Sequence, residues 1–442
     1  MKALLVTGGV LVTMDAARRV VAGDLLIEDG RITRVESAIQ APLAERIDAS
    51  GCIVLPGLVQ AHTHVCQTLC RGAADDLPLL EWLRRRVWPY EAALDERAMR
   101  AAARVAAAEL LLGGTTAILD MGTVHETDAL AAELASSGLR AVVGKAMMDV
   151  GDGVPARLRE ATARSLDESD ALAARWSGAA DGRMGWAYAP RFVLSCTEEL
   201  LREVAARVGR GARLHTHASE QEAEIALVRR ERGQDNVEYF AALGLKGPRA
   251  ALAHCVHVTG AERALLARDG TNVVHCPSSN LKLASGVAPV PEMRAQGIHV
   301  ALGADGAPCN NNLDAFVELR LAALVHKPRV GASGMTALAA LELATLGGAR
   351  ALGLEGEIGS LEAGKRADVI VVDPRAPHAT PAPDAVSTLV YAAQSRDVRD
   401  VIVDGRVLVR ERRLSALTGL DRDQVVADAR EQAARVDARV AK

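Results

Sequence analysis

Eight short apolar runs alternate with alanine-rich segments of helical period along the middle of the chain, and this alternation constrains the fold most. The runs are 58–61, 115–119, 141–144, 184–187, 213–215, 250–253, 271–274 and 298–302. Strands that alternate with helices form parallel sheets, which are either open and doubly wound or closed into a barrel. The count of eight favours a (β/α)8 TIM barrel. The segments 96–112, 197–208 and 221–232 are then expected to be helices of its outer ring.

Strand-like runs joined by Asp-Gly occur at both ends of the chain. Asp29-Gly30 joins two such runs near the N-terminus, and Asp404-Gly405 joins two near the C-terminus. Asp-Gly between apolar runs is a strong signal for a β-hairpin. Both ends are therefore expected to contain antiparallel sheet.

The division into domains follows from the size of these two ends. Neither is long enough to bury both faces of its own sheet, so residues 1–56 and 357–442 are expected to form one composite β-sandwich. The catalytic barrel would then occupy residues 57–356. The alanine-rich segment 421–442 is expected to be a helix that belongs to the composite domain and packs on its outside.

Composition limits the partners and the compartment. Hydrophobic residues make up 49% of the chain and charged residues 24%, as in a globular protein with a sizeable core. A net charge of −4 lacks the basic footprint of a nucleic-acid-binding protein. No signal-peptide pattern and no apolar run of about 20 residues occurs, so we expect a cytoplasmic protein without membrane contact. The seven cysteines form no Cys-x-x-Cys pair, which favours free buried thiols. We further expect a homo-oligomer, a dimer or a tetramer.

Polar residues end several of the predicted strands. His62 and His64 end the first, and because side chains alternate along a strand, both point to the same side. Histidines or an aspartate also end the last four strands: His215, His217, His254, His275 and Asp305. Two histidines alone could be polar residues on a solvated strand, but five such strand ends favour a metal site. His62, His64, a third histidine and Asp305 would hold one divalent ion with a position open for water, as catalytic zinc sites do, with iron or manganese as alternatives.

The order of these residues resembles the amidohydrolase superfamily, through His62-Thr63-His64, His217, His254 and Asp305. The resemblance covers essentially the whole chain and includes Pro56-Gly57-Leu58 and the segment 364–368. More narrowly, the chain is similar to the deaminases of that superfamily that act on S-adenosylhomocysteine, 5'-methylthioadenosine and 5'-deoxyadenosine. The segments that carry this similarity are 71–78, 88–91, 253–257, 277–283 and 303–307.

The resemblance implies a role for each matching residue. Four would bind the metal ion: His62, His64, His217 and Asp305. Glu220 follows His217 by three residues, as the catalytic glutamate of the family follows its ligand histidine. His215 is a rival ligand, which we expect instead to lie in the core or behind the ligands. No lysine ends the fourth strand, so we expect one metal ion rather than two bridged by a carbamate.

The implied reaction is hydrolytic release of ammonia from an adenine ring. A divalent ion lowers the pKa of bound water to about 7 and so provides hydroxide, whose proton Asp305 can share. Glu220 would protonate the ring nitrogen and then the leaving amine, and His254 would stabilise the charge of the tetrahedral intermediate. Taken singly, Glu220 could merely favour a helix N-terminus and His254 could be a core histidine, as we expect for His257 and His275.

The substrate is indicated by fewer residues. The resemblance implies that Glu91 accepts hydrogen bonds from ribose hydroxyls. Trp82 and Trp88 could form an apolar wall for the base, or belong to the core. Arg191 stands where the adenosine-type enzymes carry a histidine, and an arginine at this position is also found in guanine deaminases. Because arginine can donate to a ring nitrogen or to a carbonyl, Arg191 is compatible with either base.

Three alternatives stay open at this point. The chain could be a guanine or 8-oxoguanine deaminase, although the loop 303–312 is closer to the nucleoside type. It could act on s-triazines, which related hydrolases use as substrates. It could also be a metal-binding barrel that has lost catalysis and serves as a scaffold.

Overall fold

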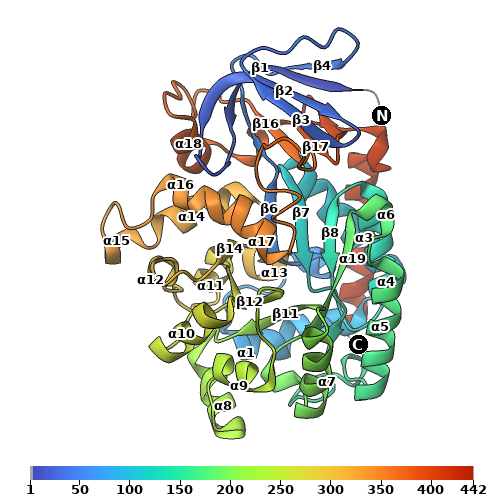
Figure 1. Cartoon of the computed structure of the whole chain (residues 1–442). Helices are drawn as coiled ribbons and strands as arrows, with labels where there is room; N and C mark the ends of the chain where they lie inside the picture. The colour runs from blue at the N-terminus through green and yellow to red at the C-terminus, as the bar shows by residue number, and fades with distance from the viewer. Residues whose placement is uncertain (1–2, 442) are drawn as a thin grey trace.

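The structure, a computed structural model that describes residues 3–441, confirms the predicted parallel barrel and the sheet domain built from both chain ends (Figure 1). The barrel strands are β6 (Leu58–His64), β7 (Thr115–Asp120), β8 (Arg140–Val143), β10 (Met184–Pro190), β11 (Arg213–Ala218), β12 (Ala250–His254), β13 (Asn272–His275), β14 (Val300–Leu302) and β15 (Asp305–Gly306). The short β9 (Ala146–Met147) pairs with β10. All these pairs are parallel. Each of the eight predicted runs overlaps one of these strands.

The ring closes through an interrupted eighth strand. Strand β14 pairs with β13, and β15, which follows two residues later, pairs with β6. Gly303 lies in the interruption, where a Cβ atom would come within 2.8 Å of the carbonyl oxygen of His62. A glycine is therefore required where the eighth strand crosses the first.

Small apolar side chains fill the inside of the barrel. Val59, Ala61, Ala117, Leu119, Val142, Ala187, Ala251, Val274 and Ala301 form one buried cluster there. Because the opposite faces of the same strands are covered by helices, the strands are apolar on both sides. This explains why the sequence shows continuous apolar runs rather than an alternation of apolar and polar residues.

The three predicted outer helices begin and end within one residue of the predicted positions, as α3 (Glu96–Leu112), α7 (Glu198–Gly209) and α8 (Glu222–Arg232). Further helices of the outer layer are α4 (Thr127–Ser137), α5 (Thr162–Trp176), α9 (Asn236–Leu243), α10 (Gly260–Asp269), α14 (Ala315–Leu324) and α16 (Ala337–Glu342). Asp95 and Thr197 accept hydrogen bonds from backbone N–H groups in the first turns of α3 and α7. Such N-caps satisfy donors that a helix leaves free at its start.

Both chain ends contribute to a second sheet, which lies at the top of Figure 1. Its strands are β1 (Leu4–Val12), β2 (Val20–Glu28), β3 (Arg31–Glu36), β4 (Glu45–Asp48), β5 (Ile53–Pro56), β16 (Val369–Val372), β17 (Val398–Val403), β18 (Arg406–Arg410) and β19 (Arg413–Leu414). Strand β16 pairs with β5, which joins the two ends in one continuous sheet. Asp29-Gly30 and Asp404-Gly405 both have positive φ, as hairpin turns require. The exact domain boundaries stay a prediction.

A buried ion pair fixes this sheet to the barrel. Arg140, at the start of β8, donates to the carboxylate of Asp368 at 2.7 and 2.9 Å. Asp368 also accepts from the backbone N–H of Asp404 at 2.8 Å. Because β5 is followed after Gly57 by β6, the terminal sheet adjoins the N-terminal ends of the barrel strands. The C-terminal ends, where sites form in barrels, point away from it.

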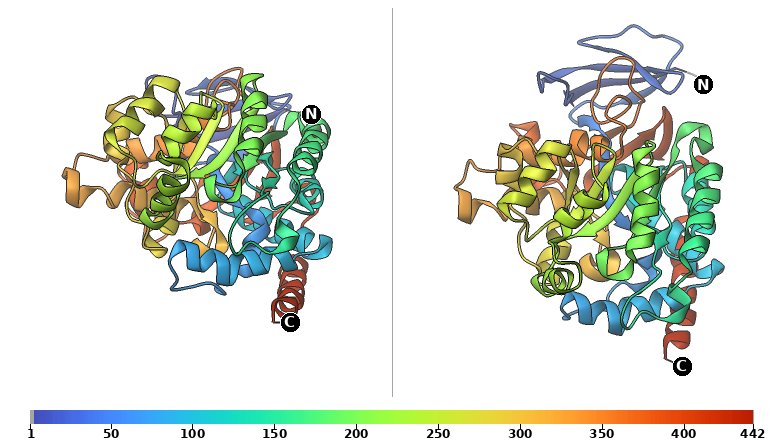
Figure 2. Two further views of the ribbon diagram at one scale, coloured as in Figure 1. Left: turned by 90° about the horizontal axis from the view of Figure 1, so that it is seen from below. Right: turned by 60° about the horizontal axis from the view of Figure 1, so that its bottom comes forward.

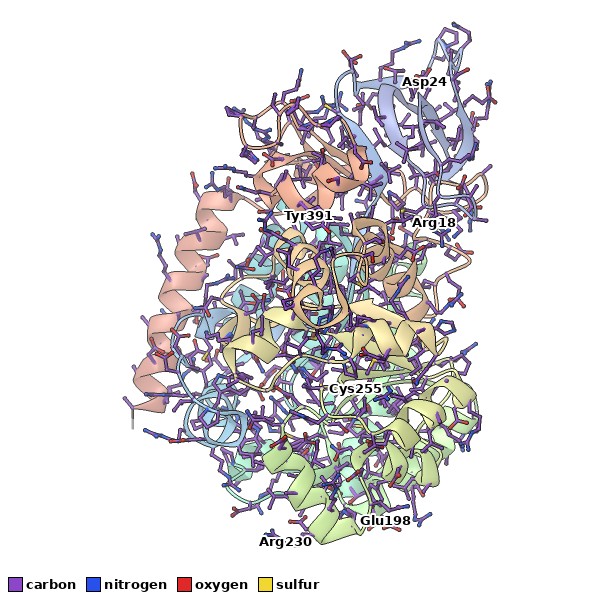
Figure 3. All side chains as sticks on the ribbon, turned by 90° about the vertical axis from the view of Figure 1, so that its left-hand side faces the viewer. Arg18, Asp24, Glu198, Arg230, Cys255 and Tyr391 are labelled. Atoms are coloured by element: carbon purple, nitrogen blue, oxygen red, sulfur yellow. The ribbon has the colours of Figure 1, made fainter. Side chains whose placement is uncertain are left out.

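The C-terminal helix lies along the barrel. Helix α19 (Arg422–Val440) packs against α3 and leads to the C-terminus (Figure 2). Arg439 forms an ion pair with Asp95. The helix therefore covers a barrel helix, although its sequence position assigned it to the composite domain. Figure 3 shows the length of the molecule, with Asp24 of β2 at one end and Arg230 of α8 at the other.

Two further expectations concern cysteines and membranes. All seven cysteines are free and buried. Among the described helices, none combines the length and the apolar character that a membrane span needs.

Candidate active site

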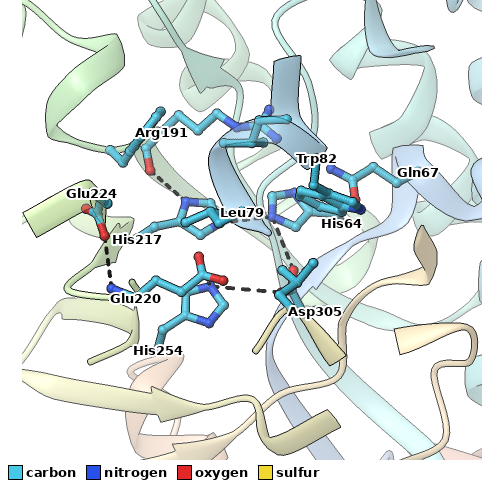
Figure 4. A pocket seen from close by; sticks show the side chains of 13 residues that line it. His64, Gln67, Leu79, Trp82, Arg191, His217, Glu220, Glu224, His254 and Asp305 are labelled. Atoms are coloured by element: carbon cyan, nitrogen blue, oxygen red, sulfur yellow. Dashed lines mark hydrogen bonds and ion pairs between the residues drawn. The ribbon is translucent and has the colours of Figure 1, made fainter. Parts of the chain in front are cut away.

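One pocket collects the polar strand ends at the C-terminal end of the barrel (Figure 4). Its polar lining consists of His64, Gln67, Arg191, His217, Glu220, Glu224, His254 and Asp305. Its apolar lining consists of Leu79, Trp82, Leu83, Phe192 and Leu283. A concave site with apolar walls and a few convergent polar groups is the usual form of a small-molecule site.

Three histidines converge on Asp305. The Nε2 atoms of His62 and His64 lie 3.3 and 3.5 Å from its Oδ1 atom. The Nε2 atom of His217 lies 3.1 Å from that of His64. Burial lowers the pKa values of His64 and His217 well below the ordinary value, so both rings are neutral at neutral pH. Neutral imidazoles and a carboxylate are the form in which these groups bind a divalent cation.

The geometry of the unpaired atoms fits such a cation. His217 Nδ1 lies 2.6 Å from the carbonyl oxygen of Arg191, so that nitrogen donates and Nε2 carries a lone pair. The Nε2 atom of His62 is buried and makes no hydrogen bond, although Oδ1 of Asp305 lies 3.3 Å away. Ligand atoms of His62, His64 and Asp305 lie within 4.8 Å of one another, as do those of His62, His217 and His254. The donor set is therefore suited to a metal ion.

A second row of polar groups orients these side chains. The Nε2 atom of His215 lies 2.7 Å from Nδ1 of His62, on the side away from Asp305, which places His215 behind His62. Asp120, at the end of β7, accepts from the backbone N–H of Val65 at 2.7 Å and from the hydroxyl of Thr63 at 3.0 Å. Both contacts hold the end of β6, from which His62 and His64 project.

Glu220 and His254 lie beside this cluster as a pair. Their Oε2 and Nε2 atoms are 3.4 Å apart, and His254 Nε2 is 3.9 Å from Oδ2 of Asp305. Burial raises the pKa of Glu220 to about 7. Burial opposes the charged form of His254, but the Glu220 carboxylate raises its pKa above the ordinary value. The pair can therefore hold a proton at neutral pH next to the cluster.

Left-handed backbone conformations bring these side chains into the pocket. Ser219, His254 and Asp305 have φ values of 52°, 73° and 63°, which non-glycine residues rarely adopt. Ser279 donates to Oδ2 of Asp305 at 2.7 Å, and Nδ1 of His254 donates to the side-chain oxygen of Asn280 at 2.9 Å. Backbone strain of this kind persists where the surroundings determine the conformation, and it is common at functional sites.

The predicted substrate residues Glu91 and Arg191 contact each other. Arg191 donates to the Glu91 carboxylate at 2.7 and 3.2 Å, and Gln67 donates to it at 2.7 Å. Arg191 and Gln67 line the pocket, whereas Glu91 lies behind them with its side chain fully buried. Glu91 thus anchors the two polar groups that face the pocket on this side.

The two predicted tryptophans take different places. Trp82, in α1 (Leu79–Trp82), lines the pocket together with Leu79 and Phe192. Trp88, at the start of α2 (Trp88–Ala93), is buried in the same apolar cluster but does not line the pocket. Trp82 is therefore the tryptophan that can contact a bound ring.

Sequence reasoning missed Gln67, Asp120 and Glu224. Gln67 follows His64 by three residues and Glu224 follows Glu220 by four, so both could have been sought at the spacing of one helical turn. Asp120 ends the second barrel strand, a position that predicts a place near the site. The partner of Gln67 is 24 residues away in the sequence and that of Asp120 is 55 away, so a local pattern does not show these contacts.

Comparison with known proteins identifies the family. Residues 53–408 match the amidohydrolase family. The chain is 44% identical over 433 residues to the 5-methylthioadenosine/S-adenosylhomocysteine deaminase of Halobacterium salinarum, covering 97% of this chain and 94% of that protein. It is 39% identical over 439 residues to the 5'-deoxyadenosine deaminase of Methanosarcina acetivorans, covering 99% of each. The crystal structure of an adenosine deaminase from Xanthomonas campestris with bound zinc superposes with a TM-score of 0.92 at 33% identity, covering 98% of both chains. The chain belongs to the amidohydrolase family.

Proposed function

We propose that the chain is a metal-dependent deaminase that releases ammonia from the adenine ring of an adenosine-type nucleoside. Adenosine, 5'-deoxyadenosine, 5'-methylthioadenosine and S-adenosylhomocysteine are the candidate substrates. The observation that carries the proposal is the Glu220 and His254 pair, which lies within 3.9 Å of a cluster of metal-ligand side chains inside a pocket with apolar walls. The names of the relatives agree with this reaction.

The metal ligands in this proposal are His62, His64, His217 and Asp305, and the ion is a single divalent cation, zinc in the first place. When bound, such an ion lowers the pKa of a coordinated water to about 7 and makes hydroxide available at neutral pH. His215 and the carbonyl of Arg191 fix the rings of His62 and His217, as second-row hydrogen bonds do in metal sites. Iron and manganese remain alternatives for the same ligands.

Glu220 is the proton carrier of the proposed reaction. A carboxyl group with a pKa of about 7 can give up and recover a proton at neutral pH. Glu220 delivers a proton to the purine nitrogen beside the attacked carbon and later to the departing amine. Ser285 donates to Oε1 of Glu220 at 3.4 Å, which leaves Oε2 directed toward His254.

His254 stabilises the negative charge on the oxygen that adds to the attacked carbon. Its Nδ1 atom is held by Asn280, and its Nε2 atom points between Glu220 and Asp305. Because the site is buried, one positioned donor of this kind is worth about 10²- to 10³-fold in rate. Asp305 shares the proton of the nucleophile.

The apolar wall of Leu79, Trp82 and Phe192 contacts the purine in this proposal. Arg191 and Gln67 face the same space, and Glu91 holds both in place. Because Glu91 lies behind these two side chains with no exposed side-chain surface, its predicted hydrogen bonds to ribose hydroxyls require Arg191 or Gln67 to move aside when the nucleoside enters. Trp88 supports this wall from behind. The cytoplasmic location, the dimer or tetramer and the absence of nucleic-acid and membrane partners stay predictions.

A substrate screen tests the proposed class. Ammonia release and ultraviolet absorbance are followed for the four candidate nucleosides, and for adenine, guanine, 8-oxoguanine and an s-triazine. We expect turnover of nucleosides and none of the free bases. Turnover of guanine or the triazine alone would overturn the substrate while leaving the hydrolytic mechanism.

Glu220→Gln tests the proton carrier. The variant keeps the size of the side chain, so we expect an unchanged metal content and a loss of about 10²- to 10⁴-fold in kcat. Glu222→Gln is the matched control, because Glu222 lies two residues away with its side chain 86% exposed. A Glu220→Gln enzyme as fast as the control would remove Glu220 from this role.

A further inference from the structure

A second buried carboxylate, Glu224, contacts the backbone of Glu220. Its Oε2 atom accepts from the Glu220 N–H at 3.0 Å, and its side chain lines the same pocket (Figure 4). We propose that Glu224 is a positioning residue, which holds the turn that aims the Glu220 carboxylate at the reacting atoms. This inference rests on the proposed role of Glu220 as proton carrier.

The turn after β11 needs support from outside. Ser219 has a φ of 52°, so the chain reverses sharply between the ligand His217 and Glu220. The Ser219 carbonyl accepts from the N–H groups of Val256 at 2.9 Å and His257 at 3.1 Å. These bonds hold one side of the turn, and the bond from the Glu220 N–H to Glu224 holds the other.

Glu224 is itself fixed by a neighbouring helix. Its Oε1 atom accepts from the side-chain amide of Asn236, the first residue of α9, and Asn236 is fully buried. Both carboxylate oxygens of Glu224 thus have donors within the protein. With both oxygens engaged, Glu224 is placed to hold Glu220 rather than to contact a substrate.

A plainer role for Glu224 would be helix capping. It is the third residue of α8, where a glutamate commonly accepts from the backbone N–H of the residue that caps the helix. Here the bond reaches one residue further back, to Glu220, while the cap is Gln221. Glu224 also accepts from Asn236 of α9, a contact that helix capping does not require. Capping alone therefore does not account for its place.

The carboxylate of Glu220 is left free by this arrangement. Glu224 takes the backbone N–H, and the polar groups of residues 3–441 that contact the Glu220 carboxylate are Ser285, at 3.4 Å, and His254, at 3.4 Å. A displacement of the turn by about 1 Å would move the carboxylate out of reach of the ring nitrogen, and misplacement of that size costs about 10²-fold in rate.

Double-mutant cycles test the proposal. Glu224→Ala, Glu224→Gln and Asn236→Ala are each made in the full-length protein and in the Glu220→Gln background, with kcat, KM, bound metal and Tm measured. Single-turnover assays with enzyme in excess keep the slow variants measurable. For Glu224→Ala we expect kcat to fall about 10²-fold with KM and metal content unchanged. Glu224→Gln should recover part of kcat, because its amide oxygen can accept from the Glu220 N–H while its amide N–H2 donates to Oδ1 of Asn236, which has no partner, once the Asn236 amide turns over.

In the Glu220→Gln background, the same substitutions should cause no further loss, because the residue that they misplace no longer transfers a proton. An equal loss in both backgrounds, or a Glu224→Ala kcat within twofold of wild type, overturns the positioning role.

Asn236→Ala removes only the hydrogen bond from Asn236 to Glu224. It should lower kcat about tenfold in the wild-type background alone, so the role is tested even if Glu224→Ala does not fold. Glu222→Ala is the control for the same helix turn. Full activity of Glu220→Gln by itself would instead remove the proposed proton carrier, and this inference with it.

Discussion

Arg191 and Glu91 form a buried, two-pronged ion pair between the end of β10 and helix α2, with Nη1 to Oε2 at 2.7 Å and Nη2 to Oε1 at 3.2 Å. The side chains are 3% and 0% exposed. Because Arg191 also accepts from His217 Nδ1 through its carbonyl, one residue connects the proposed metal site to the substrate wall. A histidine at position 191 could not donate two parallel hydrogen bonds to Glu91 as Arg191 does, because its two ring nitrogens point in different directions.

The ion pair predicts a stability effect that can be separated from activity. Arg191→Met leaves the Glu91 carboxylate buried without its cation, and breaking a buried pair from one side costs about 3–5 kcal/mol of unfolding free energy. Glu91→Gln combined with Arg191→Met should recover part of this loss, because neither charge is then left unpaired. Urea unfolding measures both effects.

The control for this pair is an exposed one on the same segment. Arg85 and Glu81 form an ion pair with side chains 59% and 45% exposed, so Arg85→Met should cost less than about 1 kcal/mol. If Arg191→Met and Arg85→Met cost the same, the buried pair does not stabilise the fold as stated.

The sequence allowed the barrel and the proposed ligands to be predicted because both depend on local patterns. Strand period and the spacing of His62 to His64 and of His217 to Glu220 are read within a few residues. The contact of Arg191 with Glu91 spans 100 residues, and periodicity carries no information on such a pair. For this reason Arg191 was expected at the base, whereas its guanidinium is bound to Glu91.

The role of His215 could not be predicted from a local pattern either, although its rival His217 is only two residues away. Because side chains alternate along β11, His215 and His217 lie on one face, and the sequence therefore allows either of them to be the metal ligand. Only the neighbouring strand decides: His62 Nδ1 meets His215 at 2.7 Å, whereas His64 Nε2 meets His217 at 3.1 Å. The two histidines therefore lie at different depths in the barrel. This difference is fixed by contacts with β6, which exist only once the barrel has closed.

His215 is predicted to tune metal affinity without binding the ion. His215→Leu removes the partner of His62 Nδ1, and loss of such a contact lowers metal affinity about 10- to 100-fold. Competition with a chelator measures the affinity of the purified protein. His275→Leu is the matched control, because His275 also ends a strand and is buried but has no hydrogen-bond partner on its ring. Equal affinities of the two variants would contradict the prediction.

Glu318 predicts a pH dependence of stability. It accepts from Ser278 of α11 (Pro277–Lys282) and Asn310 of α13 (Ala307–Asn310), the short helices that follow β13 and β15, and burial raises its pKa to about 7. The folded state therefore binds a proton more tightly than the unfolded state, whose glutamate titrates near 4.3. Stability from this group is greatest below pH 4.3 and falls by about 3 kcal/mol as pH rises to 7, with little change above.

Glu318→Gln isolates this contribution, since every other titrating group is shared with the wild type. Unfolding free energies from urea titrations at pH 5 to 8 are compared for the two proteins. The wild type should lose stability relative to the variant as pH rises. Parallel curves over this range would show that Glu318 has an ordinary pKa.

The buried ion pair that joins the terminal sheet to the barrel is predicted to affect stability without affecting activity. Asp368→Ala leaves Arg140 buried at the start of β8, with only Asp404 nearby at 3.6 Å, so the unfolding free energy should fall by about 3 kcal/mol. Glu36→Ala, which breaks an exposed pair with Arg34 in the same sheet, should cost less than about 1 kcal/mol. Because Arg140 starts β8 while the pocket lies at the opposite ends of the strands, kcat measured well below Tm should match wild type in both variants. A drop in kcat for Asp368→Ala alone would mean that the terminal sheet affects the shape of the pocket, and not only the stability of the barrel.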